Sequence, residues 1–64
     1  MIEDVPPSVY HMRPGGLFVH DLARHVLVTI LSSCFLNGVY VLTAYGKFER
    51  WGYDAFRQVH RRVL

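Results

Sequence analysis

The sequence has 64 residues, a formal net charge of +2 and one cysteine, Cys34. This length allows one small domain, and a single cysteine excludes an internal disulfide. Hydrophobic residues make up 52% of the chain and charged residues 19%, which excludes a disordered polypeptide.

The N-terminal segment, residues 1–16, is predicted to be an extended arm. It contains Pro6, Pro7, Pro14, Gly15 and Gly16. Proline and glycine at this density oppose regular secondary structure. From residue 17 we expect one helix that continues to residue 46.

The central part of that helix, residues 26–46, is predicted to cross a membrane. These 21 residues contain no Asp, Glu, Lys, Arg or His. As a helix they span roughly 30 Å, about the thickness of the bilayer core. A single segment satisfies its backbone in lipid only as a helix, so we expect this despite the many β-branched residues. There are two alternatives. A buried helix of a soluble protein would need more surrounding chain to cover it. A cleaved secretory signal usually has a shorter apolar run.

The C-terminal segment, residues 47–64, shows helical periodicity. Its apolar stripe consists of Phe48, Trp51, Ala55, Val59 and Val63, and its charged stripe of Lys47, Arg50, Asp54, Arg57 and Arg61. Two opposed stripes predict an amphipathic helix in the membrane interface. The expected interfacial anchor consists of Tyr45, Phe48, Trp51, Tyr53, Arg50 and Arg57, because aromatic and basic side chains favour the headgroup region.

Small and polar residues form a stripe along the predicted span. They are Thr29, Ser33, Asn37, Gly38 and Tyr40. An amide facing lipid is costly, and small residues let helices approach closely, so we predict a helix-packing face here. Serine and threonine that bond back to their own helix are the alternative.

No catalytic or metal-binding pattern is found in the sequence. His20 and His25 lack the spacing of a helical metal pair, and Ser32, Ser33 and Cys34 have no base nearby. We therefore predict no enzyme activity, no cofactor and no metal. The basic tail is better explained by phospholipid headgroups than by nucleic acid.

These elements together predict an all-α membrane protein with a single transmembrane helix, an extended N-terminal arm and a short amphipathic C-terminal helix. Its orientation is open. Two Lys or Arg residues precede the span and five follow it, which favours a C-terminus in the cytosol or matrix.

Short motifs occur in a recognisable order along the chain. They are Glu3–Val5–Pro6, Met12–Arg13 with Gly16–Leu17, Leu22 with His25, Gly38, Tyr40, Arg50, and Tyr53 with Phe56. In this order they resemble the cytochrome c oxidase subunit VIc family, accessory subunits of mitochondrial complex IV. That resemblance implies an N-terminus in the matrix, opposite to the charge count.

A second set of motifs resembles the small MNLL-type single-span subunit of complex I. It consists of Val19–His20–Asp21, His25–Val26–Leu27–Val28, Glu49–Arg50 and Ala55–Phe56–Arg57. Neither family carries catalytic or cofactor-binding residues.

The resemblances imply a non-catalytic accessory subunit of a respiratory-chain complex in the mitochondrial inner membrane. Cytochrome c oxidase is the first expectation and the complex I membrane arm the alternative. Its mechanism would be transmembrane helix packing against core and accessory subunits, with membrane lipids as further partners and no nucleic acid or small-molecule substrate. Two hypotheses from other classes are a stand-alone single-span regulatory micropeptide and a soluble binding module; the latter requires the chain to stay in solution without detergent.

Overall fold

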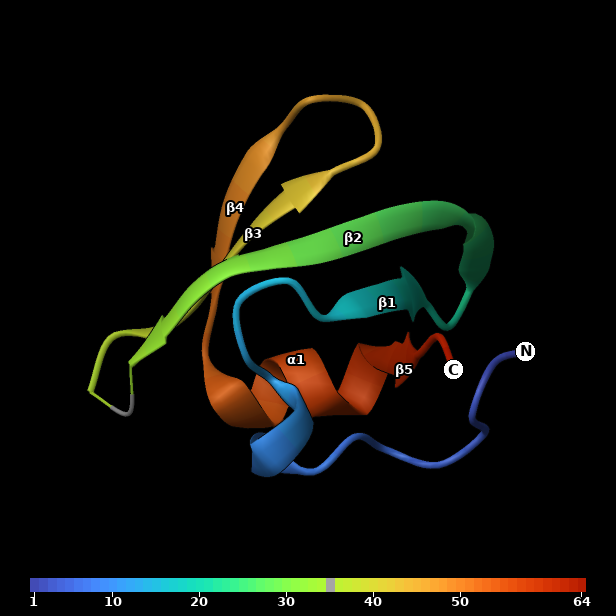
Figure 1. The fold of residues 1–64 in the computed structure, drawn as a ribbon, viewed down its shortest axis with the longest axis horizontal. Helices are drawn as coiled ribbons and strands as arrows, with labels where there is room; N and C mark the ends of the chain where they lie inside the picture. The colour runs from blue at the N-terminus through green and yellow to red at the C-terminus, as the bar shows by residue number, and fades with distance from the viewer. Residues whose placement is uncertain (35) are drawn as a thin grey trace.

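A computed structural model describes residues 1–34 and 36–64 of the protein. A short 3-10 helix, Val9–His11, precedes the first strand, and one α-helix lies between the last two strands (Figure 1). The elements in chain order are β1 (Leu17–His20), β2 (Ala23–Cys34), β3 (Gly38–Thr43), β4 (Phe48–Trp51), α1 (Tyr53–Val59) and β5 (His60–Arg62).

The five strands form one antiparallel sheet in the order β4-β3-β2-β1-β5. Strands β1 to β4 follow one another as a meander, and the chain then crosses through α1 to pair β5 with β1. The sheet curls, so that the two edge strands approach each other: the ring centroids of Trp51 in β4 and His60 in β5 are 5.0 Å apart. The sheet therefore wraps around a small core without hydrogen bonds between the described residues of its edge strands, β4 and β5.

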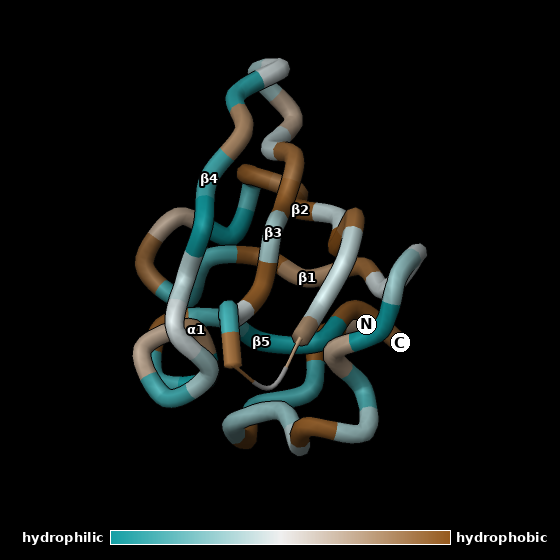
Figure 2. Tube along the Cα trace, turned by 90° about the vertical axis from the view of Figure 1, so that its left-hand side faces the viewer, coloured by the Kyte–Doolittle hydropathy of each residue, from teal (hydrophilic) through white to brown (hydrophobic). Residues whose placement is uncertain are grey.

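The core lies between the concave side of the sheet and α1. Its fully buried side chains include Phe18 of β1, Ile30 of β2, Val39 and Val41 of β3, and Phe56 of α1. Phe56 is central, since its ring meets that of Phe18 edge to face at a centroid distance of 5.1 Å. Hydrophobic residues are concentrated in the middle strands of the sheet, and the edge strands are largely hydrophilic (Figure 2).

The N-terminal segment passes along the free side of β5 before it reaches the core. Ile2 forms a bridge with Val63, and the Leu64 amide donates to the Met1 carbonyl over 2.8 Å, so the two termini lie side by side (Figure 1). Farther along, Arg57 of α1 donates to the Pro7 carbonyl over 2.7 Å. The segment thus covers one of the two edges of the sheet.

The prediction of an all-α membrane protein with a single transmembrane helix is wrong. The expected helix over residues 17–46 is replaced by β1, β2 and β3, and the expected C-terminal helix over 47–64 shrinks to the seven residues of α1 between two strands. Among the described residues no helix has the length and apolar character needed to cross a bilayer. The predicted single-pass location in the mitochondrial inner membrane depended on that helix and is therefore wrong as well.

The error has a physical cause in β2 and β3. Strands that are apolar on both faces read as a continuous hydrophobic run, as membrane helices do. Val28 and Ile30 point into the core, whereas their neighbours Leu27 and Leu31 lie on the opposite face and are nearly half exposed. The β-branched residues of this run therefore follow their ordinary strand preference.

A turn also interrupts the run where the helix was predicted to continue. Gly38 begins β3 with a φ of +90°, which residues other than glycine rarely adopt. A Cβ atom at this position would collide with the Trp51 carbonyl oxygen of the neighbouring strand. Gly38 therefore lets β3 pair closely with β4 directly after the turn.

Candidate functional site

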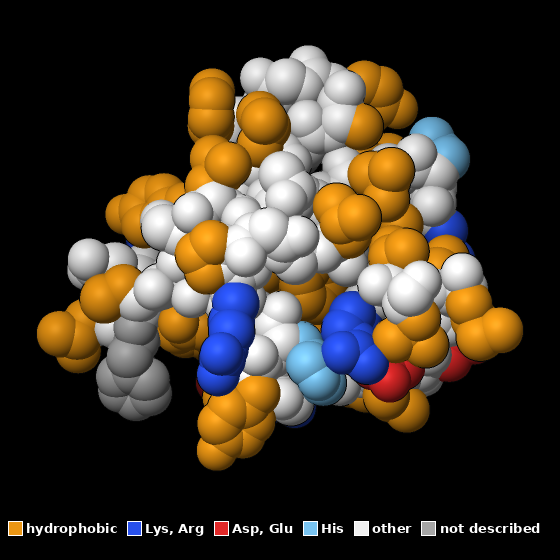
Figure 3. Space-filling model, viewed as in Figure 1, with side chains coloured by type: hydrophobic (Ala, Val, Ile, Leu, Met, Phe, Trp, Pro, Cys, Tyr) orange, Lys and Arg blue, Asp and Glu red, His pale blue; other side chains and the backbone are white. Residues whose placement is uncertain are grey.

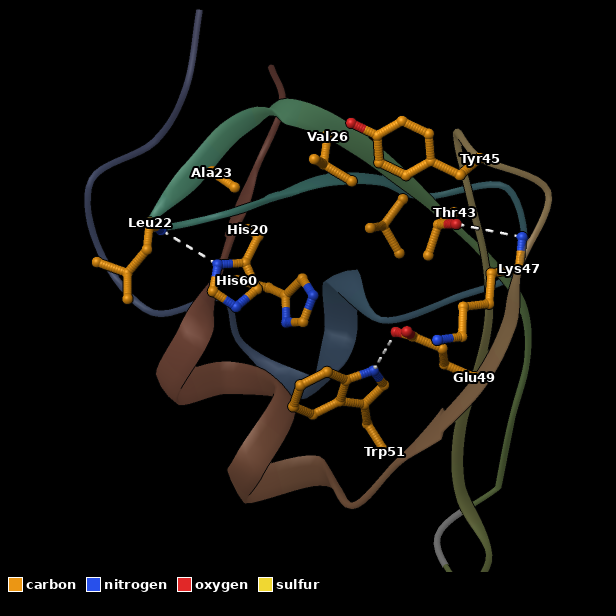
Figure 4. A pocket seen from close by; sticks show the side chains of 11 residues that line it. His20, Leu22, Ala23, Val26, Thr43, Tyr45, Lys47, Glu49, Trp51 and His60 are labelled. Atoms are coloured by element: carbon orange, nitrogen blue, oxygen red, sulfur yellow. Dashed lines mark hydrogen bonds between the residues drawn. The ribbon is translucent and has the colours of Figure 1, made fainter.

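A cavity of about 460 Å³ opens where the curled sheet is not closed by hydrogen bonds, between β4 and the β1–β5 side (Figure 4). Its lining combines rings, aliphatic side chains and one pair of opposite charges. The lining residues are His20, Leu22, Ala23, Val26, Val28, Thr43, Tyr45, Lys47, Glu49, Trp51 and His60.

Two histidines form one wall of this cavity (Figure 4). His20 ends β1 and His60 begins β5, and the register of the two strands places them opposite each other. Their rings meet edge to face at a centroid distance of 5.4 Å, and the His20 Nδ1 atom accepts a hydrogen bond from the Leu22 amide. The wall is therefore built from the sheet itself and not from a loop.

His60 is buried and neutral. Its ring stacks on Phe56 at a centroid distance of 4.0 Å, and Nδ1 lies 3.1 Å from the Phe56 carbonyl oxygen, to which it donates. Burial lowers the pKa of His60 to about 4, because a charged ring loses its hydration there. At neutral pH the ring therefore offers the cavity an uncharged aromatic surface.

The opposite wall is formed by every second residue from position 47, just before β4, to position 51 at the end of β4. Lys47, Glu49 and Trp51 face the cavity because successive side chains of a strand point to opposite sides. The indole Nε1 of Trp51 donates to Glu49 Oε1 over 3.1 Å, which fixes both side chains (Figure 4). Tyr45, in the β3–β4 turn, stands at the rim and is 75% exposed.

The backbone next to this wall is an open sheet edge. Strand β4 pairs with β3 on one side and has no partner strand on the other among the described residues. The Lys47 carbonyl accepts from the Thr43 amide, so it points toward β3. Because peptide groups alternate in direction along a strand, the N–H and C=O groups of Phe48 and Arg50 point away from β3. They are free to pair with another extended chain.

The residues predicted as an interfacial anchor are distributed over three places. Tyr45 and Trp51 line the cavity. Phe48 and Arg50 lie on the other side of β4, and Tyr53 and Arg57 belong to α1. The structure therefore brings together only two of them at this site.

The residues predicted as a helix-packing face do not form one stripe. Thr29 and Tyr40 lie on the side of the sheet away from the core, Ser33 is paired with the buried Val39, and Asn37 and Gly38 belong to the turn and the start of β3. A period of four residues places side chains on one face of a helix, but a strand needs a period of two.

The site also contains four residues that are not predicted from the sequence: His20, Lys47, Glu49 and His60. One signal was present: the alternation of Lys47, Glu49 and Trp51 has the period of a strand. The pairing of two histidines 40 positions apart could not be read from the sequence, since it depends on the register of β1 and β5.

No group of three or more metal-ligating side chains is found in residues 1–34 and 36–64. The charged pair in the cavity and the ring-lined walls instead suit a ligand that is held by contact and hydrogen bonds. The chain matches no family model, no curated protein and no solved structure.

Proposed function

We propose that this domain is a non-enzymatic binding module that takes an extended peptide from a protein partner. The observation that carries the proposal is the position of a ring-lined cavity directly beside the unpaired edge of β4. Backbone hydrogen bonds at a sheet edge supply affinity, and a neighbouring pocket for alternate side chains supplies specificity.

The free edge determines how the peptide would lie. An incoming strand would pair with the N–H and C=O groups of Phe48 and Arg50. The other edge of the sheet, β5, is already covered by the N-terminal segment, through the Ile2–Val63 bridge and a hydrogen bond from the Glu3 amide to the Arg62 carbonyl. Strand addition is therefore directed to β4.

The cavity determines which side chain the peptide would insert. Its volume is about 460 Å³, and Val26 and Val28 contribute aliphatic surface to its lining. The rings of Trp51 and the neutral His60 add flat apolar surface. An aliphatic or aromatic side chain fits this lining, with Lys47 and Glu49 available to a flanking polar group.

The topology is consistent with a binding role without defining it. The sheet is a meander of four strands to which β5 is added beside β1 after a short helix, and a single fold can carry many unrelated functions. Peptide binding is therefore supported by the cavity and the free edge of β4 and not by the fold.

The accessory-subunit and micropeptide hypotheses stay predictions that no observation tests. Both relied on a transmembrane helix for their mechanism, and the described residues contain none.

The proposal can be tested with a phage-displayed library of random nonapeptides panned against the full chain. We expect enriched peptides to share one apolar residue within an extended, β-prone segment. Trp51 is the only tryptophan, so its fluorescence should change when the synthetic peptide fills the cavity. A proline placed at a peptide position whose amide pairs with β4 should abolish binding.

Two tyrosines of equal exposure provide a matched control. Tyr45 at the cavity rim is 75% exposed, and Tyr10, remote from the cavity, is 74% exposed. We expect Tyr45→Ala to weaken the peptide Kd at least fivefold and Tyr10→Ala to change it less than twofold. No enriched motif, or equal losses in the two variants, would overturn the proposal.

A further inference from the structure

We infer that the outer face of the sheet is a contact surface for a second copy of this chain. The outer face is the side turned away from Phe18 and Phe56. Its apolar residues are Leu17, Leu27, Leu31, Tyr40, Leu42 and Phe48, from the four strands β1 to β4. This surface is separate from the cavity, so the inference does not depend on the proposed peptide binding.

The strand register makes this face continuous. Leu17 lies opposite Thr29, Thr29 opposite Leu42, and Leu42 opposite Phe48, which forms a row across four strands. Residues of this row also line two shallow hollows of about 280 and 260 Å³, so the face offers both protruding side chains and depressions. In Figure 3, hydrophobic side chains are spread over the upper half of the molecule, where few charged ones are seen.

The exposure of these side chains is unusual for a sheet that faces water. A sheet with one face in solvent normally alternates apolar and polar residues along each strand. Here Leu17, Leu27 and Leu31 are each more than 40% exposed, and Phe48 is 72% exposed. Such a patch indicates an interaction surface.

Charge favours a second copy as the occupant. A two-fold interface places a patch against itself, so like charges on the patch would repel. The charged residues that line the hollows of this face are Glu49, which accepts a hydrogen bond from Trp51, and Arg50, whose guanidinium donates to the Asn37 carbonyl over 3.0 Å at the β2–β3 turn. Arg61 of β5 lies at the edge of the face, opposite Val19. Two copies can therefore meet through this face without placing like charges against each other at its centre.

The size of the molecule also fits a dimer. The principal extents are 29 × 25 × 18 Å. The largest face of such a body presents at most about 700 Å², so two stacked copies would bury no more than about 1,400 Å², a limit that lies within the range of specific interfaces. A domain of this length with no disulfide also belongs to the size range in which oligomerisation commonly supplies stability.

A lipid surface is the weaker occupant. Binding to anionic lipid needs basic side chains free at the rim of the apolar patch. Arg24 is paired with Asp4 and Asp21 at 2.7 and 2.8 Å, and Arg61 and Arg62 lie near Asp21 and Glu3. These pairs neutralise three of the seven Lys and Arg side chains of the domain.

Sedimentation velocity of the full chain from 2 to 400 µM tests the inference. We expect a concentration-dependent species of twice the 7.4 kDa chain mass. Leu27→Lys and Leu31→Lys, each on the outer face, should weaken the dimer at least tenfold. Leu36→Lys is the matched control, because Leu36 is 87% exposed but lies in the β2–β3 turn. Far-UV circular dichroism should show the same fold in all three variants.

A second measurement keeps the test independent of the variants. An isotope-filtered NOESY spectrum of mixed labelled and unlabelled chain should show contacts from the Leu31 methyl groups to Tyr40 or Phe48 of the other copy. A monomer over the whole concentration range would overturn the inference, as would a monomer that binds phosphatidylcholine–phosphatidylglycerol vesicles. A dimer unaffected by both lysine variants, or equally weakened by the control, would overturn the assignment to this face.

Discussion

Protonation of His60 should destabilise the fold as the pH falls from 6.5 to 4. The ring is 1% exposed, stacks on Phe56 and has its pKa lowered to about 4 by burial. In the unfolded chain the same ring has an ordinary pKa of 6.5. Between these two values the unfolded chain binds a proton that the folded chain excludes, so acid favours unfolding.

The magnitude follows from the two pKa values. Stability is nearly independent of this group above about pH 7.5, has fallen by about 2 kcal/mol at pH 5, and by roughly 3 kcal/mol near pH 4. Below pH 4 both states bind the proton, so the loss stops. For a domain of this size, 2 kcal/mol corresponds to a decrease in Tm of roughly 10 °C.

The variant His60→Phe should remove most of this dependence. A phenylalanine ring does not titrate but can still stack on Phe56. The Phe56 carbonyl still accepts a hydrogen bond from the backbone amide at position 60. Asp21, whose pKa is lowered by its hydrogen bond from Arg24, loses its contribution only below its ordinary pKa of 3.8, outside the window of His60. The two groups can therefore be separated by pH.

The assay is urea denaturation followed by Trp51 fluorescence and circular dichroism at pH 7.5, 6.5, 5.5 and 4.5 and one protein concentration. His25→Gln, at an exposed histidine in β2, is the control and should keep the wild-type pH dependence. If the wild type and His60→Phe lose the same stability between pH 7.5 and 5.5, the reasoning about His60 is refuted.

Two further changes test the packing. Gly38→Ala should cost about 3 kcal/mol, because it adds the strain of a φ of +90° to a collision with the Trp51 carbonyl. Gly46→Ala, at a φ of +78° with open space around it, should cost only about 1–2 kcal/mol, and equal urea midpoints for the two variants would contradict the collision. Phe56→Ala should cost about 3–5 kcal/mol, most of the stability of a domain this small, so a sharp thermal transition near the wild-type Tm would contradict its central place in the core.

The sequence contained enough information to locate the apolar residues but not to choose their secondary structure. Residues 26–46 are free of charge, and this property fits both a membrane helix and two strands that are apolar on both faces. The β-branched residues Val26, Val28, Thr29 and Ile30 favour a strand in water. Because a single segment in a bilayer must be helical, the predicted membrane span overrode this strand preference, and β2 was not predicted.

The candidate site was predictable only in fragments. Trp51 and Tyr45 were selected for their aromatic character, and they do line the cavity. The partners that make it a site come from β1 and β5, which are joined to β4 only by the curling of the sheet. No local pattern reports that His20 and His60 lie opposite each other.

Composition and spacing by themselves determined that this is one small domain with a single cysteine and more apolar surface than its length can enclose. The tertiary structure decided where that surface goes. One part of it, including Phe18, Ile30 and Phe56, fills the core, and another part lies on the outer face of the sheet and in the cavity beside β4. The physical reason is that hydrophobicity favours removal of a side chain from water, whereas strand register and the curvature of the sheet determine which residues it packs against.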